Sequence, residues 1–131
     1  FVPYPFLPDD SRLPEAQLAT GTEILRVIAV SRLMLYNIPH IKAYRMNIGD
    51  EIAELALQFG ADDIDGTVQK ESIMHLAGSR APLDHDKSRL AKIVIDSGSI
   101  PVQRNTIYSS FTKYKAPKVP KRRVLQMAIG D

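Results

Sequence analysis

Two neighbouring segments decide the fold: Ile38-Pro39-His40-Ile41-Lys42-Ala43-Tyr44, and Gly60-Ala61-Asp62-Asp63-Ile64-Asp65-Gly66-Thr67-Val68. Each is a short apolar run with polar residues at its end, and a helical pattern lies between them. Strands buried on both faces of a parallel sheet have this pattern, and the chemistry of such folds lies in the loops beyond the carboxyl ends of the strands. The two segments therefore predict an α/β fold with functional side chains after each strand.

The same strand and helix alternation extends along the chain. Thr20 and Glu23 have the spacing of a capping box, and the helix that follows is apolar almost all round, so we expect it to be largely buried. Gly60 is placed to end the next helix, and Asp84 or Asp86 to begin a later one that Gly98 closes. We expect strands at 1–6, 40–46 and 63–68, helices at 24–35, 50–59, 71–77 and 84–97, and a final helical turn or two at 106–111.

Connections of this length favour right-handed parallel crossovers. Three strands cannot close a barrel, and the segment on its own would expose two sheet edges. We therefore expect the chain to need a partner, either a further part of the same protein or a second copy in a homo-oligomer. The start at Phe1, without an initiator methionine, suggests that the chain is part of a larger barrel.

Four motifs resemble one enzyme family: 1–8, His-Ile-Lys-Ala-Tyr at 40–44, Asp-Ile-Asp-Gly-Thr-Val at 63–68, and 100–108. In order and spacing they are similar to the C-terminal third of the radical S-adenosylmethionine (SAM) enzymes of menaquinone biosynthesis, above all the aminofutalosine synthases. The cyclic dehypoxanthine futalosine synthases and the FO synthases share the layout. The resemblance implies that 1–112 form about three βα units, the sixth to eighth of a (β/α)8 TIM-type barrel. A basic, Pro-containing extension would follow at 113–131.

The resemblance also implies a reaction. An aminofutalosine synthase joins the adenosyl group of SAM to 3-[(1-carboxyvinyl)oxy]benzoate by radical addition and decarboxylation in the futalosine pathway. A 4Fe-4S cluster, held by three cysteines of a Cys-x3-Cys-x2-Cys loop, starts this chemistry. The present chain has no cysteine, so it cannot ligate the cluster and is not competent alone.

A substrate with two carboxylates needs cationic or hydrogen-bonding side chains. Alternation along 40–46 places His40, Lys42 and Tyr44 on one face, which we expect to point into the barrel. The other face, with Arg45, is the alternative. The remaining candidates for substrate binding are Thr67 and Arg104, although a clamp on the C-terminal segment is the interpretation we prefer for Arg104.

Three further residues are candidates for catalysis: Asp65, Glu71 and His75. Asp65 could contact nucleoside hydroxyls or cap the following helix, and Asp62 or Asp63 could cap the turn. Glu71 and His75 lie one helical turn apart, so they could meet for proton transfer or form an exposed ion pair. We assign no metal to these residues and no role to His85, and the residues that contact SAM stay unknown.

Several positions depart from the family pattern, among them Lys70 and Ser99, and two others matter more. Arg45 stands where an aromatic residue, usually tryptophan, is expected, and Asn105 replaces an aspartate after Arg104. Both changes alter charge near motif residues. They leave the identity of the substrate open within the family.

Composition indicates an ordinary soluble chain, with 44% hydrophobic and 24% charged residues. It has no transmembrane run or signal peptide, so we expect a cytoplasmic protein without a membrane partner. Six of the 17 basic residues fall at 113–123, where there is no acid, which leaves 11 basic and 15 acidic residues elsewhere. Such a tail could bind an anionic polymer, but a solvated extension is the interpretation we prefer, and we do not expect nucleic acid as a partner.

Two hypotheses follow. The chain is the C-terminal part of an aminofutalosine synthase or of one of its two relatives, acting on a small molecule together with an N-terminal barrel portion. Alternatively, it is a non-catalytic barrel segment that binds a partner protein or, through 113–123, an anionic polymer.

Overall fold

The computed structural model describes residues 1–9, 11–13 and 15–115. Strands β1 (Lys42–Ala43) and β2 (Asp63–Ile64) pair in parallel, with Lys42 opposite Asp63. On the other side of β1, the amino group of Phe1 donates to the His40 carbonyl at 2.7 Å, and the Lys42 N–H donates to the Phe1 carbonyl at 2.8 Å. This alternation is that of a parallel pair. The three segments expected to be strands therefore lie side by side, although the first is held by these two bonds and forms no regular strand.

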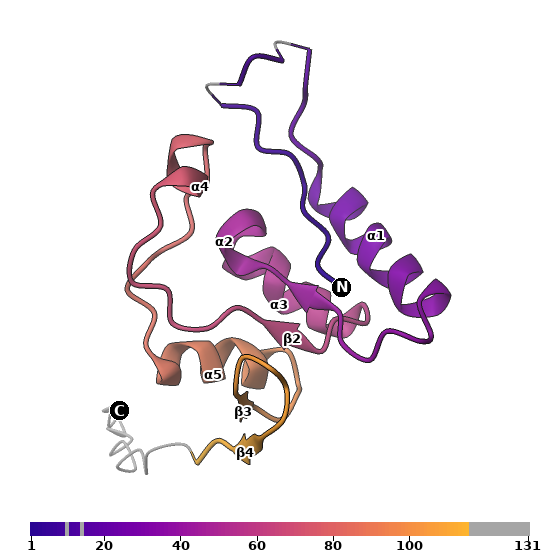
Figure 1. Cartoon of the computed structure of the whole chain (residues 1–131), viewed down its shortest axis with the longest axis vertical. Helices are drawn as coiled ribbons and strands as arrows, with labels where there is room; N and C mark the ends of the chain where they lie inside the picture. The colour runs from indigo at the N-terminus through magenta and orange to yellow at the C-terminus, as the bar shows by residue number, and fades with distance from the viewer. Residues whose placement is uncertain (10, 14, 116–131) are drawn as a thin grey trace, which may run out of the picture.

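The described part of the chain also contains five helices and a hairpin (Figure 1). The hairpin pairs β3 (Val102–Arg104) with β4 (Phe111–Lys113) in antiparallel register. The helices are α1 (Gly21–Met34), α2 (Arg45–Ile48), α3 (Asp50–Gln58), α4 (Ile73–Leu76) and α5 (Lys87–Asp96). None of them is long and apolar enough to cross a membrane.

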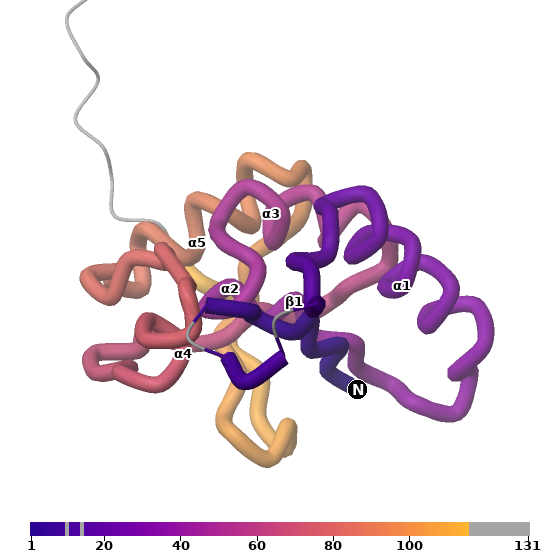
Figure 2. Tube along the Cα trace, turned by 90° about the horizontal axis from the view of Figure 1, so that it is seen from above, coloured from indigo at the N-terminus to yellow at the C-terminus, as the bar shows by residue number. Residues whose placement is uncertain are grey.

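The hydrophobic core lies between the parallel segments and the helices α1 and α3. Ile41 and Ala43 of the β1 region are fully buried, as are Ile28 of α1 and two alanines of α3. Viewed from above, α3 lies between α1 and α5 (Figure 2), and it contacts both. The helices thus cover one face of the parallel segments. Lys42, which alternates with Ile41 and Ala43, points to the other face.

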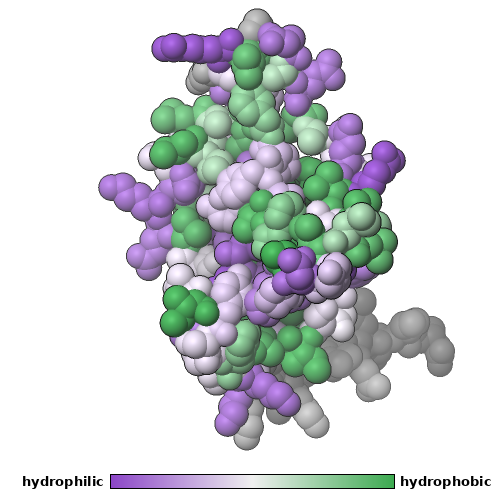
Figure 3. All heavy atoms as spheres, turned by 45° about the vertical axis from the view of Figure 1, so that its right-hand side comes forward, coloured by the Kyte–Doolittle hydropathy of each residue, from purple (hydrophilic) through white to green (hydrophobic). Residues whose placement is uncertain are grey.

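Helix α1 begins as the sequence predicts. Thr20 and Glu23 form the capping box, with the Thr20 N–H donating to the Glu23 carboxylate at 2.7 Å. The expectation that the helix is largely buried is wrong, because only Ile24, Ile28 and Ser31 are buried. Leu33 and Met34 are 78% and 70% exposed, and the side of the molecule that carries α1 shows hydrophobic patches (Figure 3). An apolar circumference predicts burial only where a second layer covers the outer face, and the described residues provide none there.

Helices α3 and α5 agree with the prediction. Gly60 follows α3 with a φ of 111°, and Asp86 caps α5 by accepting from the Arg89 N–H at 2.8 Å. Gly98 follows α5 with a φ of 83°. These positive angles are the backbone conformation for which glycine is suited.

The two expected strands that form are shorter than predicted. The strand at 40–46 stops at Ala43 and α2 begins at Arg45, because the Asp65 carboxylate accepts the Arg45 N–H at 2.5 Å and caps this helix from the neighbouring segment. The strand at 63–68 ends at Ile64. The helix expected at 71–77 is limited to α4, because the Glu71 carboxylate accepts from the N–H groups of Ile73 and Met74 and so stays outside it.

The helical turn expected at 106–111 is wrong. This segment is the loop of the β3–β4 hairpin and the first residue of β4. Asn105 organises the loop, since its side-chain oxygen accepts from the N–H groups of Ser109 and Ser110 at 2.9 and 3.3 Å. Most of the basic extension, 116–131, lies outside the described residues, and Lys113 is the last residue of β4.

Candidate active site at the ends of β1 and β2

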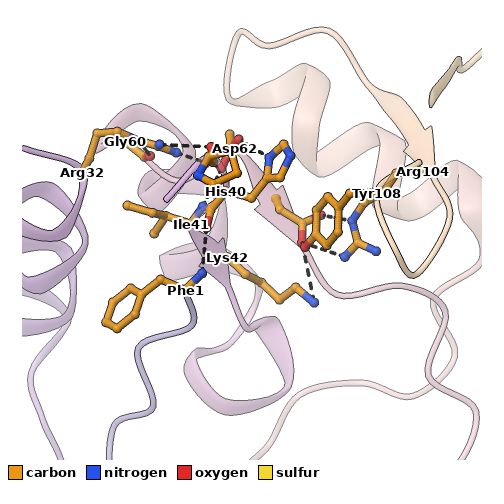
Figure 4. Close-up of polar contacts among 11 residues, drawn as sticks. Phe1, Arg32, His40, Ile41, Lys42, Gly60, Asp62, Arg104 and Tyr108 are labelled. Atoms are coloured by element: carbon orange, nitrogen blue, oxygen red, sulfur yellow. Dashed lines mark hydrogen bonds and ion pairs between the residues drawn. The ribbon is translucent and has the colours of Figure 1, made fainter. Parts of the chain in front are cut away.

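The helix-free face of β1 and β2 carries a cluster of charged side chains centred on Asp63. Arg104, from β3, donates Nε to Asp63 Oδ1 at 2.8 Å and a terminal nitrogen to Oδ2 at 2.7 Å. The Tyr108 hydroxyl, from the hairpin loop, donates to Oδ2 at 2.6 Å. The Lys42 ammonium lies 3.6 Å from the same oxygen. The hairpin thus folds back onto the strands (Figure 4).

These contacts set the protonation states of the cluster. Burial acts to raise the pKa of Asp63, but the hydrogen bonds from Arg104 and Tyr108 outweigh it and lower that pKa below its ordinary value. Burial and the bond to Asp63 raise the pKa of Tyr108 to about 12. Asp63 is therefore a carboxylate and Tyr108 a neutral donor at pH 7. Of the two roles foreseen for Arg104, the clamp on the C-terminal segment is the one that the contacts show.

His40 lies at the amino end of β1. Its Nδ1 is 2.8 Å from Asp62 Oδ2, and its ring stacks on Tyr108 with centroids 4.4 Å apart. Asp62 also accepts from the Ile41 N–H at 2.7 Å and from Arg32 of α1 at 2.8 Å (Figure 4). Asp62 thus ties α1, β1 and β2 together, and His40 is held between Asp62 and the hairpin.

Tyr44 and Asp65 lie at the carboxyl ends of the two strands. The Tyr44 ring is 5.0 Å from the Tyr4 ring, and burial together with Tyr4 raises the Tyr44 pKa to about 12. Asp65 is buried; its Oδ1 caps α2, and its Oδ2 lies 3.5 Å from the Arg45 guanidinium without a hydrogen bond to the described residues. Burial raises the pKa of Asp65, and Arg45 opposes that shift. Asp65 therefore caps α2. The sequence also allowed a cap on the helix that follows Asp65 in the chain, and that contact does not form among the described residues.

Sequence reasoning missed a buried charged group beside Asp65. Arg45 is fully buried and donates to Asp50 at 3.2 Å and to the Pro82 carbonyl at 3.0 Å. His85, to which we had assigned no role, is buried too, with Nε2 2.6 Å from the other Asp50 oxygen. The unusual Arg45 was a signal that a counter-charge must be near. No spacing rule connects Arg45 with Asp50 and His85, which come from separate segments.

The predicted meeting of Glu71 with His75 does not occur. Glu71 caps α4, and His75 Nε2 lies 2.9 Å from the Ala81 carbonyl, with no ion pair between the two in the part of the chain that is described. Thr67 is exposed in the loop after β2 and lines a cavity of about 570 Å³ beside Asp63 and Arg104. The structure therefore brings Lys42 and Arg104 to Asp63, and places Thr67 at the cavity beside them and His40 between Asp62 and the hairpin. Glu71 and His75 are left in contacts of their own.

The residues of this chain do not fit an iron–sulfur cluster. The sequence has no cysteine, and within 1–9, 11–13 and 15–115 no group of three or more histidine or acidic side chains could hold a metal ion. No step of the chemistry is assigned to a metal on this chain.

Comparison with known proteins decides the family. The model of the CofH/MqnC C-terminal region matches residues 1–117. The chain belongs to this family. This confirms the resemblance drawn from the four motifs.

Three curated relatives are similar to this CofH/MqnC segment over most of its length. The aminodeoxyfutalosine synthase of Thermus thermophilus is 41% identical over 112 residues, which cover 82% of this chain and 30% of the relative. That of Streptomyces coelicolor is 43% identical over 107 residues, covering 81% of this chain and 28% of the relative. The 5-amino-6-(D-ribitylamino)uracil–L-tyrosine 4-hydroxyphenyl transferase of Methanoculleus marisnigri is 40% identical over 113 residues, 83% of this chain and 31% of the relative. The chain thus spans less than a third of the length of each.

Proposed function

We propose that this chain is the C-terminal part of an aminofutalosine synthase, which joins the adenosyl group of SAM to 3-[(1-carboxyvinyl)oxy]benzoate in menaquinone biosynthesis. The observation that carries the proposal is the identity of 41% and 43% to two aminodeoxyfutalosine synthases, each over more than 100 residues. The alternatives are the reactions of the cyclic dehypoxanthine futalosine synthases and of the hydroxyphenyl transferases. We place the full-length enzyme in the cytoplasm.

In this proposal, Phe1, β1 and β2 belong to the last strands of a (β/α)8 barrel. Their parallel order supports it, as does the cover of helices on one face alone. The cluster and SAM, which together supply the adenosyl radical, would be held mainly by the N-terminal part of the full-length enzyme. What this chain contributes is the binding and orientation of the substrate and the exclusion of water.

Lys42 is the residue we propose for binding a substrate carboxylate. Arg45 is fully buried and bonded to Asp50, and Arg104 is bonded at two nitrogens to Asp63. Among the described residues, the Lys42 ammonium has only the 3.6 Å contact with Asp63, and its side chain is 23% exposed. It therefore has donors to offer to an anionic ligand.

The other candidates keep narrower roles. Tyr44 is a neutral donor at the carboxyl end of β1, suited to a substrate oxygen. Asp65 is proposed for a nucleoside hydroxyl through Oδ2, which has no hydrogen bond to the described residues. Thr67 lines the cavity beside β2. Glu71 and His75 remain proposed catalytic groups, which would have to act separately.

The test is turnover by the full-length enzyme. The wild type should convert 3-[(1-carboxyvinyl)oxy]benzoate and SAM to aminofutalosine, and should neither cyclise dehypoxanthine futalosine nor transfer hydroxyphenyl from tyrosine. Lys42→Met should raise the KM for the benzoate about 10-fold to 100-fold, since a hydrogen-bonded charge pair is lost. Lys92→Met, on the exposed surface of α5, is the matched control and should behave as wild type. Turnover of one of the other substrates, with none of the enol ether, would refute the proposal.

A further inference from the structure

The Oδ2 atom of Asp63 has more donors around it than its two lone pairs can accept. Arg104 donates to both carboxylate oxygens, and Tyr108 adds a second hydrogen bond to Oδ2. A carboxylate oxygen offers about two lone-pair sites. With Oδ2 fully used, the Lys42 ammonium lies 3.6 Å away, beyond hydrogen-bond distance. The Lys42 ammonium is therefore attracted electrostatically by the Asp63 carboxylate but forms no hydrogen bond with it.

Tyr108 reaches Oδ2 at a cost to its backbone. Its φ is 55°, in the left-handed region that non-glycine residues seldom adopt. Such a conformation persists where the surroundings over-determine it. Here the guanidinium carbon of Arg104 lies 4.0 Å from the centroid of the Tyr108 ring. The His40 ring stacks on the Tyr108 ring, with the two centroids 4.4 Å apart. These contacts fix where the hydroxyl points.

We propose that Arg104 and Tyr108 are positioning residues that keep Oδ2 of Asp63 saturated, so that the Lys42 ammonium stays free to bind a carboxylate of an aromatic dicarboxylate substrate. The inference rests on the proposed function, and it assigns a task to the hairpin. Without the Tyr108 hydroxyl, one site on Oδ2 becomes vacant. Lys42 then closes the gap and forms an ion pair with Asp63. The substrate must break that pair in order to bind.

The first test is Tyr108→Phe in the full-length enzyme. The KM for 3-[(1-carboxyvinyl)oxy]benzoate should rise about fivefold, the scale of one modest ion pair, while kcat stays within about twofold. Adding Asp63→Asn should bring KM back toward wild type, because the amide has no charge to hold Lys42. Tyr114→Phe is the matched control, because it removes a hydroxyl that is 2.9 Å from Ser88 and not bonded to Asp63. It should leave both constants unchanged.

A second readout does not depend on turnover. An amine-reactive acylating reagent should label Lys42 of the full-length enzyme about fivefold more slowly in Tyr108→Phe than in wild type, as quantified by peptide mass spectrometry. Equal labelling, or a lower kcat with unchanged KM, would mean that Tyr108 only supports the fold, and would overturn the inference. If the wild type fails to convert the enol ether, the proposed function is lost. The labelling experiment still decides the role of Tyr108.

Discussion

Replacing Arg45 by methionine should destabilise the protein by about 4 kcal/mol. Methionine fills much of the same volume, so the change removes the charge and leaves the packing largely intact. Asp65 is 5% exposed and would lose the guanidinium 3.5 Å from its Oδ2. Breaking a buried pair from one side costs about 3–5 kcal/mol, because the other charge stays behind without a partner. The Pro82 carbonyl loses a donor as well.

The assay is urea unfolding followed by circular dichroism, with a double-mutant cycle. Asp65→Asn keeps an oxygen for the Arg45 N–H and removes the charge. Arg45→Met combined with Asp65→Asn should therefore cost about 1–3 kcal/mol less than the sum of the two single changes. Lys92→Met, at an exposed pair, should cost less than about 1 kcal/mol. A loss below 1 kcal/mol for Arg45→Met, or additive costs in the cycle, would show that Arg45 does not compensate Asp65.

Three further predictions concern stability. Hydrogen bonds from Arg104 and Tyr108 hold the pKa of Asp63 in the folded protein below the ordinary value of about 3.9. The stabilisation that the Asp63 carboxylate provides is therefore present above that pH and is lost as pH falls through the pKa of the folded state. The unfolding free energies of wild type and Asp63→Asn should converge below about pH 4. Thr20→Ala breaks the capping box and should cost about 1 kcal/mol in urea unfolding, with no loss contradicting the cap. Ile28→Ala should lower the free energy of unfolding by about 2–5 kcal/mol, against about 0.5 kcal/mol for the exposed Leu33→Ala; equal losses would contradict the packing of α1.

Local signals were read correctly where one segment supplies all of the information. The capping box at Thr20, the glycine that ends α3 and the Asp86 cap of α5 are examples, because each depends on residues within one turn of the helix end. Alternation along β1 also held, with Ile41 and Ala43 buried and Lys42 on the opposite face.

Contacts between distant segments account for the errors. The strand predicted at 40–46 stops early because Asp65, twenty residues later, caps α2. The hairpin was mistaken for a helical turn, because the side chain of Asn105 organises a loop whose pattern is also compatible with a helix. The pairing of Glu71 with His75 assumed that the helix included Glu71, which instead caps it.

The candidate site was predictable in part. Lys42 and Arg104 were candidates from the sequence, and the structure brings them to Asp63, whereas Asp63 had been considered only as a cap and Tyr108 had not been singled out. The distribution of donors among acceptors is not encoded in spacing, since it depends on how the hairpin folds back. The position of Arg45 was noticed as unusual, but Asp50 and His85 could be found only from the folded chain.

The left-handed backbone at Tyr108 has a consequence for redesign of this hairpin. A design method that ranks amino acids by how well they tolerate a positive φ would choose glycine or asparagine at this position. Either choice would relax the loop and lower its conformational energy. Either would also delete the phenol that spans Asp63, Arg104 and His40. A more stable variant obtained in this way should therefore be screened for ligand affinity before it is accepted as an improvement.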